Sequence, residues 1–354
     1  MHIVIIGDGP AGEKAAEIIY REKPEYRVTI ITEESCPFYL RPGLMNYIAG
    51  ELKESASGGF CSKDIAKYRD RNINLLLNSR VTKLDPVKQE LELMSTQSAS
   101  GGNEKLPSVH YDQLLIATGA NYFIAPPLLP FRQYIHTIYN LNDANRLIEQ
   151  SKTAKKAVVM GSSLLGAELV RVLHILGLEV TYLTRKETFW PRTLFHTHAE
   201  QVASVLREHN IDLVYGEDIR GITVYSNKVA GVVTSKKREI DCDLVGIATD
   251  LVPNVEFLNP TKADSGLKIF RGIVVDSQMR TNIPNIYAAG DIAQVYYPKH
   301  NMHQVHYSWI NASNQGEIAG YNLAGIERSF REEYATEDIE MYGLNMLSRW
   351  TRNQ

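Results

Sequence analysis

Three glycines near the N-terminus, Gly7, Gly9 and Gly12, have the spacing of a loop that binds the pyrophosphate of a dinucleotide. The apolar run 3–6 precedes them as a buried strand, and an amphipathic helix follows. Gly7 allows the tight turn, Gly9 lets the backbone approach the phosphates, and Gly12 lets the helix lie close to the strand. The start of this helix then offers free N–H groups and a positive dipole end to an anion.

An acidic side chain at the end of the next strand would bind the ribose hydroxyls of the same dinucleotide. Glu33 and Glu34 follow the apolar strand 28–31 at that place, and Glu33 is the favoured candidate. Pro10 and Ala11 complete the loop of this first nucleotide site. The alternative, glycines that only form a turn, is disfavoured by the flanking strands and by the acid.

A second strand–loop–helix–strand unit repeats this pattern, and its glycine loop starts 154 residues (161 − 7) after the first. The loop is Gly161-Ser162-Ser163-Leu164-Leu165-Gly166. Ser163 stands where the loop should approach a pyrophosphate most closely. Its Cβ would displace the phosphates outward, whereas its hydroxyl is available to donate a hydrogen bond to them.

The strand that closes the second unit ends in Thr184, and Arg185 and Lys186 follow it. An acid at this place favours NAD because it binds the 2′-hydroxyl, whereas a cation favours the 2′-phosphate of NADP. These residues therefore favour NADP over NAD. A loop that is kept only for packing is the alternative interpretation of the second unit.

Composition limits the classes of protein that this chain can be. A length of 354 residues predicts more than one domain. With 38 Lys+Arg against 41 Asp+Glu the formal net charge is −3, so no basic surplus favours binding to nucleic acid. No apolar run is long enough to span a bilayer, and no leader sequence follows Met1. The three cysteines cannot form a disulfide framework, and reduced thiols indicate a cytoplasmic protein.

With these motifs the chain resembles the FAD-dependent pyridine nucleotide–disulfide oxidoreductase superfamily, and within it the rubredoxin reductase, nitrite reductase flavoprotein and ferredoxin reductase-like branch. Besides the first loop, the resemblance rests on five segments: Phe38-Tyr39-Leu40-Arg41-Pro42, Ala117-Thr118-Gly119, Gly166-Ala167-Glu168, Pro253-Asn254 and Thr281 through Asp291. It implies an α/β fold with two Rossmann-like nucleotide-binding domains of the three-layer ββα type, the second inserted in the first. The expected limits are 1–120 and 251–325 for the FAD-binding domain, 121–250 for the NAD(P)-binding domain, and 326–354 for a truncated, partial C-terminal interface segment.

The resemblance also implies roles for individual residues. FAD would lie on the first loop, with Asp291 bonded to its ribitol, Val81 at its adenine, and Arg41 with Pro42 beside the flavin. NAD(P)H would lie on the second loop, with Glu168 near the nicotinamide; Glu168 and Arg41 are the catalytic candidates. The remaining FAD candidates from the family segments are Ala117, Thr118, Gly119, Gly290 and Trp309. In ferredoxin reductase-like members a lysine pairs with the matching glutamate, whereas this chain has Met45-Asn46 at the position of that lysine.

The cysteines separate this chain from the best-known chemistry of the superfamily. Disulfide reductases of this kind need two cysteines close together in sequence, and the peroxidase-like branch needs one in the segment matched by 39–42, where this chain has Pro42. Cys36 has no partner at the spacing of a redox pair, and Cys61 and Cys242 are expected to be inert thiols. The histidines at 300, 303 and 306 lack the cysteine or paired acid that would complete a metal site.

The sequence therefore predicts an FAD-dependent NAD(P)H oxidoreductase that passes electrons through the flavin to an external acceptor without a redox-active disulfide. The acceptor is open between a small iron–sulfur protein, a partner redox subunit and oxygen. The oligomeric state is also open. The alternative function is a non-enzymatic FAD-bound subunit or nucleotide-responsive module with a weak second site.

Overall fold

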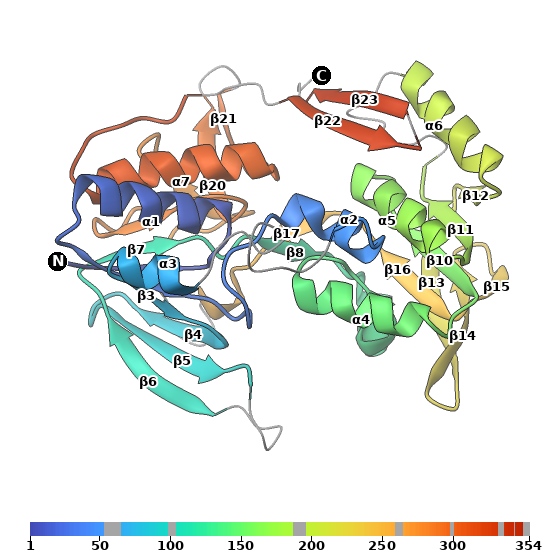
Figure 1. Ribbon diagram of the computed structural model, residues 1–354, viewed down its shortest axis with the longest axis horizontal. Coiled ribbons are helices and arrows are strands. Elements are labelled where there is room, and N and C mark those ends of the chain that lie inside the picture. The colour runs from blue at the N-terminus through green and yellow to red at the C-terminus, as the bar shows by residue number, and fades with distance from the viewer. Residues whose placement is uncertain are drawn as a thin grey trace. The chain divides into compact units, whose positions relative to one another are not determined.

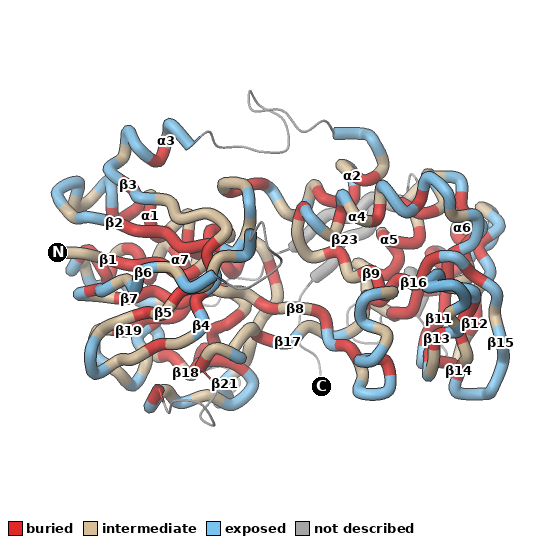
Figure 2. The backbone as a smooth tube through the Cα atoms, turned by 90° about the horizontal axis from the view of Figure 1, so that it is seen from below, coloured by how far each residue is buried: buried red, intermediate tan, exposed pale blue. Residues whose placement is uncertain are grey.

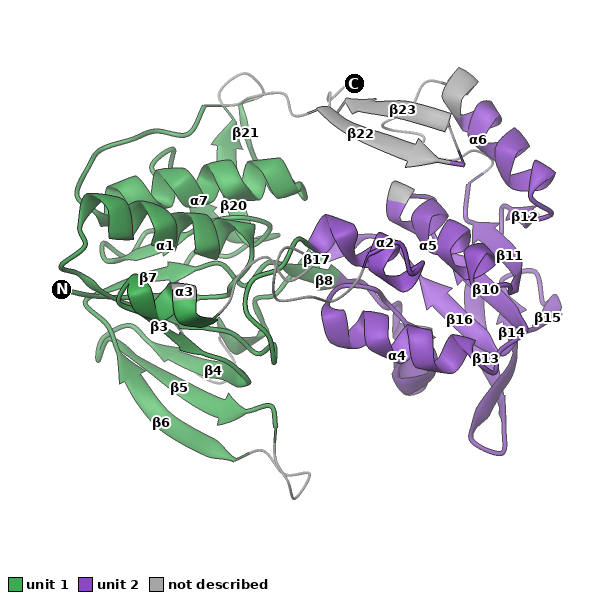
Figure 3. Ribbon diagram, in the orientation of Figure 1, with its two compact units in different colours: residues 1–40, 55–121, 252–333 green, residues 41–54, 122–251, 334–354 purple. Residues whose placement is uncertain are grey.

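The computed structural model (Figure 1) describes residues 1–52, 65–97, 104–186, 196–258, 265–297, 301–331, 336–342 and 344–349. It divides into two compact units (Figure 3). Unit 1 comprises Met1–Leu40, Ser55–Asn121 and Val252–Glu333; unit 2 comprises Arg41–Glu54, Tyr122–Leu251 and Tyr334–Gln354. Two of the boundaries between the units fall within β8 (Ala120–Tyr122) and β17 (Leu251–Pro253), which pair with each other. Residues 41–54, which the sequence places in the first domain, group with unit 2.

Unit 1 is built on a five-stranded parallel sheet. Its strands, in spatial order, are β19 (Ile286–Ala288), β7 (Gln113–Ile116), β1 (His2–Ile6), β2 (Arg27–Ile31) and β3 (Ile73–Leu76). β1 lies in the middle and is almost entirely buried, because Ile and Val side chains pack on both faces of the sheet. The apolar runs at 3–6 and 28–31 thus form strands as the sequence predicts.

Helices and antiparallel strands complete unit 1. Its helices are α1 (Pro10–Glu22), α3 (Ile65–Asp70), α7 (Trp309–Leu323) and the short 3₁₀ helix η3 (Glu256–Leu258). α1 and α7 lie side by side, because the small Ala11 and Gly316 let their backbones approach closely. One antiparallel sheet contains β4 (Ser79–Asp85), β5 (Glu90–Ser95) and β6 (Lys105–His110). A second small sheet contains β18 (Ile273–Val275), β20 (Ala293–Tyr297) and β21 (Met302–Gln304).

Unit 2 repeats this design with its own five-stranded parallel sheet. The spatial order is β12 (Asp212–Tyr215), β11 (Glu179–Thr184), β10 (Lys156–Met160), β16 (Leu244–Ile247) and β9 (Ile135–His136). An antiparallel sheet of β13 (Ile219–Tyr225), β14 (Lys228–Thr234) and β15 (Glu239–Asp241) follows β12, as β4–β6 follow β3 in unit 1. In both units buried residues run along the parallel strands (Figure 2).

The helices of unit 2 come from two of its three segments. They are η1 (Arg41–Gly43), α2 (Leu44–Ile48), η2 (Pro126–Tyr134), α4 (Leu141–Ser151), α5 (Leu164–Ile175) and α6 (His196–Glu208). The hairpin of β22 (Thr336–Met341) and β23 (Leu344–Arg349) belongs to the same unit. The predicted α/β fold with Rossmann-like parallel sheets is confirmed. No helix in the described part of the chain combines the length and the apolar character that crossing a bilayer requires.

Candidate active site

The first glycine loop packs so tightly that two of its three glycines have no room for a side chain. Gly7 has a φ of +108°, and a Cβ there would lie 2.2 Å from the carbonyl oxygen of Ala117. A Cβ on Gly12 would lie 2.0 Å from the carbonyl oxygen of Gly7. The turn and the close approach of α1 to β1 therefore require glycine at both positions.

Gly9 differs, because a Cβ there would meet no atom within 4 Å. The space above Gly9 is thus open, and it lies at the start of α1, where Gly9 is the N-cap residue and no side chain caps the helix. Pro10 occupies the first turn and has no N–H, so Ala11 and Gly12 carry the N–H groups that a helix leaves without an internal partner. An open cradle below an uncapped helix N-terminus fits a pyrophosphate, and the loop therefore fits FAD.

Ala117, Thr118 and Gly119 continue from β7 beside this loop. Thr118 and Asn254 bind each other reciprocally: the Thr118 hydroxyl donates to the Asn254 carbonyl at 3.1 Å, and the Asn254 amide donates to the Thr118 carbonyl at 2.8 Å. The Asn254 backbone N–H also donates to the Gly119 carbonyl at 3.0 Å. The Pro253-Asn254 motif therefore fixes the Ala-Thr-Gly segment within unit 1.

Asp8 is a structural member of the loop that the sequence did not single out. It is buried, and its Oδ2 accepts hydrogen bonds from the backbone N–H of Phe38 and from the Tyr68 hydroxyl, each at 2.8 Å. Burial and the Asp8 carboxylate raise the pKa of Tyr68. One carboxylate thus joins three distant segments of unit 1. The sequence signal that could have identified Asp8 is its position as a charged residue between two glycines of the loop.

The two acids at the end of β2 have different partners. Glu33 is exposed and forms an ion pair with Arg80, whose Nε lies 2.7 Å from Glu33 Oε2. Glu34 accepts a hydrogen bond from the Tyr39 hydroxyl at 2.5 Å. Val81 follows Arg80 in β4 and is buried. Glu33 thus lies at the strand end where a ribose-binding acid is expected, beside a cation that the sequence did not indicate.

The last predicted FAD residues lie where β19 ends and α7 begins. Gly290 has a φ of +82°, and its N–H donates to Oε1 of the buried Gln315 at 2.8 Å. Asp291 comes next and is partly exposed. Trp309 is the first residue of α7, and its ring lies 5.7 Å from that of Phe38. Gln315 therefore joins α7 to the Gly290–Asp291 turn that the family resemblance assigns to FAD.

The second glycine loop shares the tight turn but not the open cradle. A Cβ on Gly161, whose φ is +155°, would lie 2.1 Å from the carbonyl oxygen of Ala248. Ser163 is the N-cap of α5: its hydroxyl accepts from the N–H of Gly166 at 3.4 Å and donates to the Ala248 carbonyl at 3.1 Å. The hydroxyl thus supports the loop itself. Ser162 and Leu165 are partly exposed on either side of it, and Leu164 starts the helix.

At the end of β11, Thr184 is 1% exposed, and its hydroxyl donates to the Lys186 carbonyl at 2.6 Å. The Thr184 side chain is therefore turned inward and is not available to a ribose. Arg185 is exposed, and its Nε lies 3.8 Å from Oδ2 of Asp218. Asp218 is a neighbour that the sequence did not point to, because it follows a different strand.

Arg41 and Glu168, the two catalytic candidates, both belong to unit 2. Arg41 donates to the Tyr139 carbonyl at 2.8 Å and lies over the Tyr139 ring. Glu168 lies on α5 near Tyr122, a buried residue whose pKa is raised by burial first and then by the Glu168 charge. Asp143 raises the same pKa. The structure thus groups Glu168 with two tyrosines and an acid that sequence reasoning did not assign to the site.

The segment that carries Arg41 and Pro42 is fixed to α5 by Arg171. The Arg171 guanidinium lies 3.0 Å from Oδ1 of Asn46 and 3.3 Å from Oε1 of Glu51, and its side chain is only 13% exposed. The family resemblance places Met45-Asn46 at the position of the lysine that pairs with the glutamate matched by Glu168. In this chain Asn46 binds Arg171, so the docking of this segment does not depend on a lysine–Glu168 pair.

The two described thiols differ in burial. Cys242 is buried, and its pKa is raised to about 12 by burial and then by Asp243 and Asp241. Cys36 is partly exposed, whereas Cys61 and His300 lie outside the described residues. The rings of His303 and His306 contact Tyr296 and Tyr297. Within the described ranges, no three His, Cys, Asp or Glu side chains are grouped to bind a metal ion.

Comparisons with known proteins place this arrangement in a family. The profile of the pyridine nucleotide-disulphide oxidoreductase family matches residues 1–316. An NADH oxidase from Methanocaldococcus jannaschii is 29% identical over 333 residues, 93% of this chain and 71% of the oxidase. An NADH-rubredoxin oxidoreductase from Clostridium acetobutylicum is 27% identical over 98% of this chain and 80% of its own length. The solved structure of a NAD-dependent persulfide reductase from A. fulgidus has a TM-score of 0.84 at 28% identity, covering 97% of this chain and 62% of that one.

The chain therefore belongs to the pyridine nucleotide-disulphide oxidoreductase family. It is an FAD-dependent oxidoreductase that uses NAD(P)H, as the sequence predicts. The alternative of a non-enzymatic module is set aside. The roles of the individual site residues toward FAD and the nicotinamide remain predictions.

Proposed function

We propose that this flavoenzyme reduces a small iron–sulfur protein, directly from its flavin and without a redox-active disulfide. One observation carries the proposal: no two cysteines of the sequence have the spacing of a redox-active disulfide, and the position of the peroxidase-type cysteine is occupied by proline. Pro42 stands where the peroxidase-like branch has its cysteine, and no two of Cys36, Cys61 and Cys242 are close in sequence. Cys242 is also held as a neutral thiol by its raised pKa, which reaches about 12. The electrons must then leave for an external acceptor.

The residues that would hold FAD support this assignment. The N–H groups of Ala11 and Gly12 would bind the pyrophosphate, Glu33 would accept hydrogen bonds from the adenosine ribose, and Asp291 would bind the ribitol chain. FAD, when bound, can accept two electrons as a hydride and release them one at a time. The protein contributes position and electrostatics, and no acid or base of the chain is required for hydride transfer.

Relatives differ in the acceptor that their names state. The Clostridium relative is named for rubredoxin, whereas the Methanocaldococcus relative is named as an NADH oxidase. Pro42 favours the first of these acceptors for our chain, because the cysteine that serves the peroxidase-like branch is missing. The protein would therefore react only slowly with oxygen when an iron–sulfur protein is present.

The test is anaerobic reduction of purified rubredoxin and of a [2Fe–2S] ferredoxin by the FAD-loaded protein, with NADH and with NADPH, followed by absorbance. The same mixtures in air report oxygen consumption and peroxide. We expect nicotinamide-dependent reduction of at least one iron–sulfur protein at a rate above that of oxygen consumption. Rapid oxygen consumption without reduction of either protein would contradict the proposal and identify an oxidase.

A further inference from the structure

The two units place an ion pair at the same point of their folds, but with the charges exchanged. In unit 1 the N–H of Ser79, after β3, donates to the carbonyl of Thr32, after β2, at 2.9 Å. In unit 2 the N–H of Glu217, after β12, donates to the carbonyl of Thr184, at the end of β11, at 3.2 Å. These backbone hydrogen bonds identify equivalent positions in the two parallel sheets.

The residue that follows each of these four positions is charged. Glu33 pairs with Arg80 in unit 1, and Arg185 pairs with Asp218 in unit 2. The strand end that faces a ribose in a Rossmann unit therefore carries an acid in unit 1 and a cation in unit 2. An acid there accepts hydrogen bonds from ribose hydroxyls, whereas a guanidinium is suited to a phosphate.

A second guanidinium reaches the same carboxylate. Arg220 Nε lies 3.0 Å from Oδ1 of Asp218, while Arg185 Nε lies 3.8 Å from Oδ2. Both arginine side chains are 56% exposed, whereas that of Asp218 is 12% exposed. The backbone of Asp218 is itself fixed, because its N–H donates to the Ser235 hydroxyl and its carbonyl accepts from the Ser235 N–H. The Asp218 carboxylate thus accepts a hydrogen bond from Arg220 Nε and lies within ion-pair distance of Arg185 Nε, and neither contact uses a terminal amino group.

We infer that Arg185 and Arg220, bridged by Asp218, bind the 2′-phosphate of NADPH, and that this coenzyme is the preferred hydride donor. The inference rests on the proposed function, because it concerns the donor side of the same enzyme. Lys186 adds a third cation beside the pair. Two arginines can share the two negative charges of a phosphate, whereas the 2′-hydroxyl of NADH is neutral and offers no charge for them to bind.

Glu217 is the competing group at this strand end. It is 7% exposed, and its Oε2 has no hydrogen-bond partner within the described ranges. A carboxylate here could accept the 2′-hydroxyl of NADH, as Glu33 would for FAD. The charges favour NADPH, because Arg185, Lys186 and Arg220 outnumber Glu217 and Asp218, and Asp218 already bridges the arginines.

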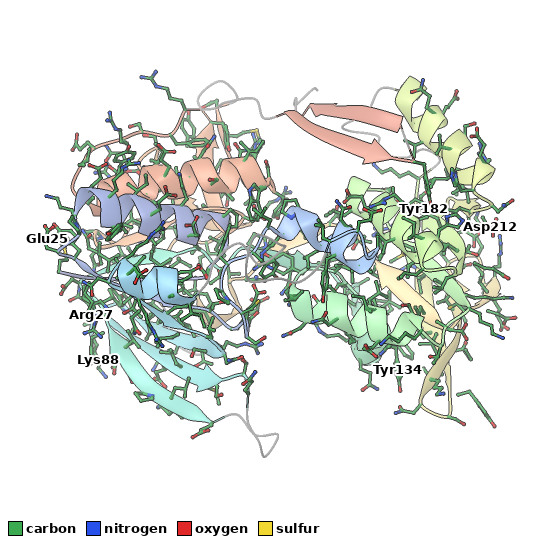
Figure 4. The ribbon with its side chains drawn as sticks, in the orientation of Figure 1. Glu25, Arg27, Lys88, Tyr134, Tyr182 and Asp212 are labelled. Atoms are coloured by element: carbon green, nitrogen blue, oxygen red, sulfur yellow. The ribbon has the colours of Figure 1, made fainter. Side chains whose placement is uncertain are left out.

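The first measurement is calorimetric binding of adenosine 2′,5′-bisphosphate and of adenosine 5′-diphosphate to the FAD-loaded protein. These probes differ in the 2′-phosphate and need no turnover. We expect tighter binding of the 2′-phosphorylated probe, and a loss of about 10- to 100-fold for that probe alone in Arg185→Ala and in Arg220→Ala. Arg238→Ala is the matched control, because Arg238 pairs with Asp212, the first residue of β12, whereas Asp218 follows the end of that strand. Asp212 is labelled in Figure 4, and the control should leave both affinities unchanged.

The second measurement is kcat/KM for NADPH and NADH in the same variants and in Glu217→Gln. Selective loss of NADPH efficiency in both arginine variants supports the inference. Equal losses for both coenzymes, or a parent preference for NADH that Glu217→Gln abolishes, would overturn it.

If the 2′-phosphate dependence is found but no iron–sulfur protein is reduced, the phosphate site stands and the proposed acceptor fails. If an acceptor is reduced but the probes bind alike, the acceptor stands and the phosphate site fails.

Discussion

Gly12 faces Gly7 across the first loop so closely that a Cβ on Gly12 would lie 2.0 Å from the Gly7 carbonyl oxygen. Because that oxygen belongs to the backbone, it cannot move aside as a flexible side chain would. We expect Gly12→Ala to lower the free energy of unfolding by about 1–3 kcal/mol and to reduce the FAD content of the purified protein. Urea unfolding and the flavin absorbance per protein measure the two effects.

Gly9→Val separates the fold from the cofactor, because a Cβ on Gly9 meets nothing within 4 Å. Gly9 has a φ of −90° and a ψ of −172°, an extended conformation that valine adopts readily. The FAD-free variant should therefore unfold within about 0.5 kcal/mol of the FAD-free parent. It should nevertheless purify with little flavin, since the branched side chain fills the space assigned to the pyrophosphate. Full FAD content in Gly9→Val would exclude this loop as the FAD site.

Replacing each of two buried tyrosines of unit 1 by phenylalanine should change the free energy of unfolding in opposite directions. The Tyr68 hydroxyl donates to the buried Asp8 carboxylate, so Tyr68→Phe should lower the free energy of unfolding by about 1.5–3 kcal/mol. The Tyr111 hydroxyl is buried without a hydrogen-bond partner in the described part of the chain. Tyr111→Phe should therefore raise the free energy of unfolding by about 1 kcal/mol. Urea denaturation of both variants at neutral pH tests the pair, and effects of the same sign would contradict it.

Tyr111 also predicts how stability changes in alkaline solution. Burial, and then the charge of Asp85, raises its pKa to about 12. In the unfolded chain the Tyr111 hydroxyl loses its proton near pH 10. Between about pH 10 and 12 the folded state therefore binds more protons than the unfolded state. Tyr111 therefore adds no pH-dependent term below about pH 10, and the folded state loses stability relative to the unfolded chain as the pH rises from about 10 to about 12. Unfolding free energies measured between pH 8 and 11 should fall less steeply in Tyr111→Phe than in the parent. The difference between the two slopes should not exceed about 1.4 kcal/mol per pH unit, the limit for one titrating group.

Much of the fold followed from local patterns. The strands at 3–6 and 28–31 and their counterparts in unit 2 were predicted, because short β-branched runs beside glycine loops have few alternative structures. Gly177 directly follows the C-cap of α5 with a φ of +86°, a conformation that a glycine after a helix commonly adopts. Such features depend on residues that are neighbours in sequence.

The parts of the site that were missed depend on contacts between distant segments. The Asp218 that orients Arg185 follows another strand, and Tyr68 reaches Asp8 from a helix 60 residues away. The association of Asn46 with Arg171 joins positions 125 apart. Periodicity and motif spacing carry no information about such pairs, because only the packed sheets and helices bring them together. The family resemblance supplied Arg41 and Glu168 but not their tyrosine neighbours.

The thiols should be dispensable for catalysis. We expect a folded Cys36→Ser, Cys61→Ser, Cys242→Ser protein to keep most of its nicotinamide-dependent reductase activity. In the parent, Cys242 should resist iodoacetamide at pH 8, since its pKa of about 12 leaves almost no thiolate. Mass spectrometry of the alkylated protein, before and after unfolding, identifies which thiols react. Loss of activity with FAD still bound would indicate a thiol relay.

Glu168 tests the donor side of the reaction. It is partly exposed on α5, and its charge acts on the buried Tyr122 together with that of Asp143. If Glu168 helps to position the nicotinamide, Glu168→Gln should slow the bleaching of flavin absorbance by NAD(P)H about tenfold, or about 1.4 kcal/mol in the barrier. The FAD content should stay unchanged, because the predicted FAD loop belongs to unit 1.

Glu179→Gln, which neutralises an exposed glutamate at the start of β11 in unit 2, is the control and should react at the parent rate. Stopped-flow measurement under anaerobic conditions gives the rate and its dependence on coenzyme concentration. An unchanged limiting rate in Glu168→Gln would remove this residue from the catalytic site, and a weaker coenzyme affinity alone would assign it to binding instead.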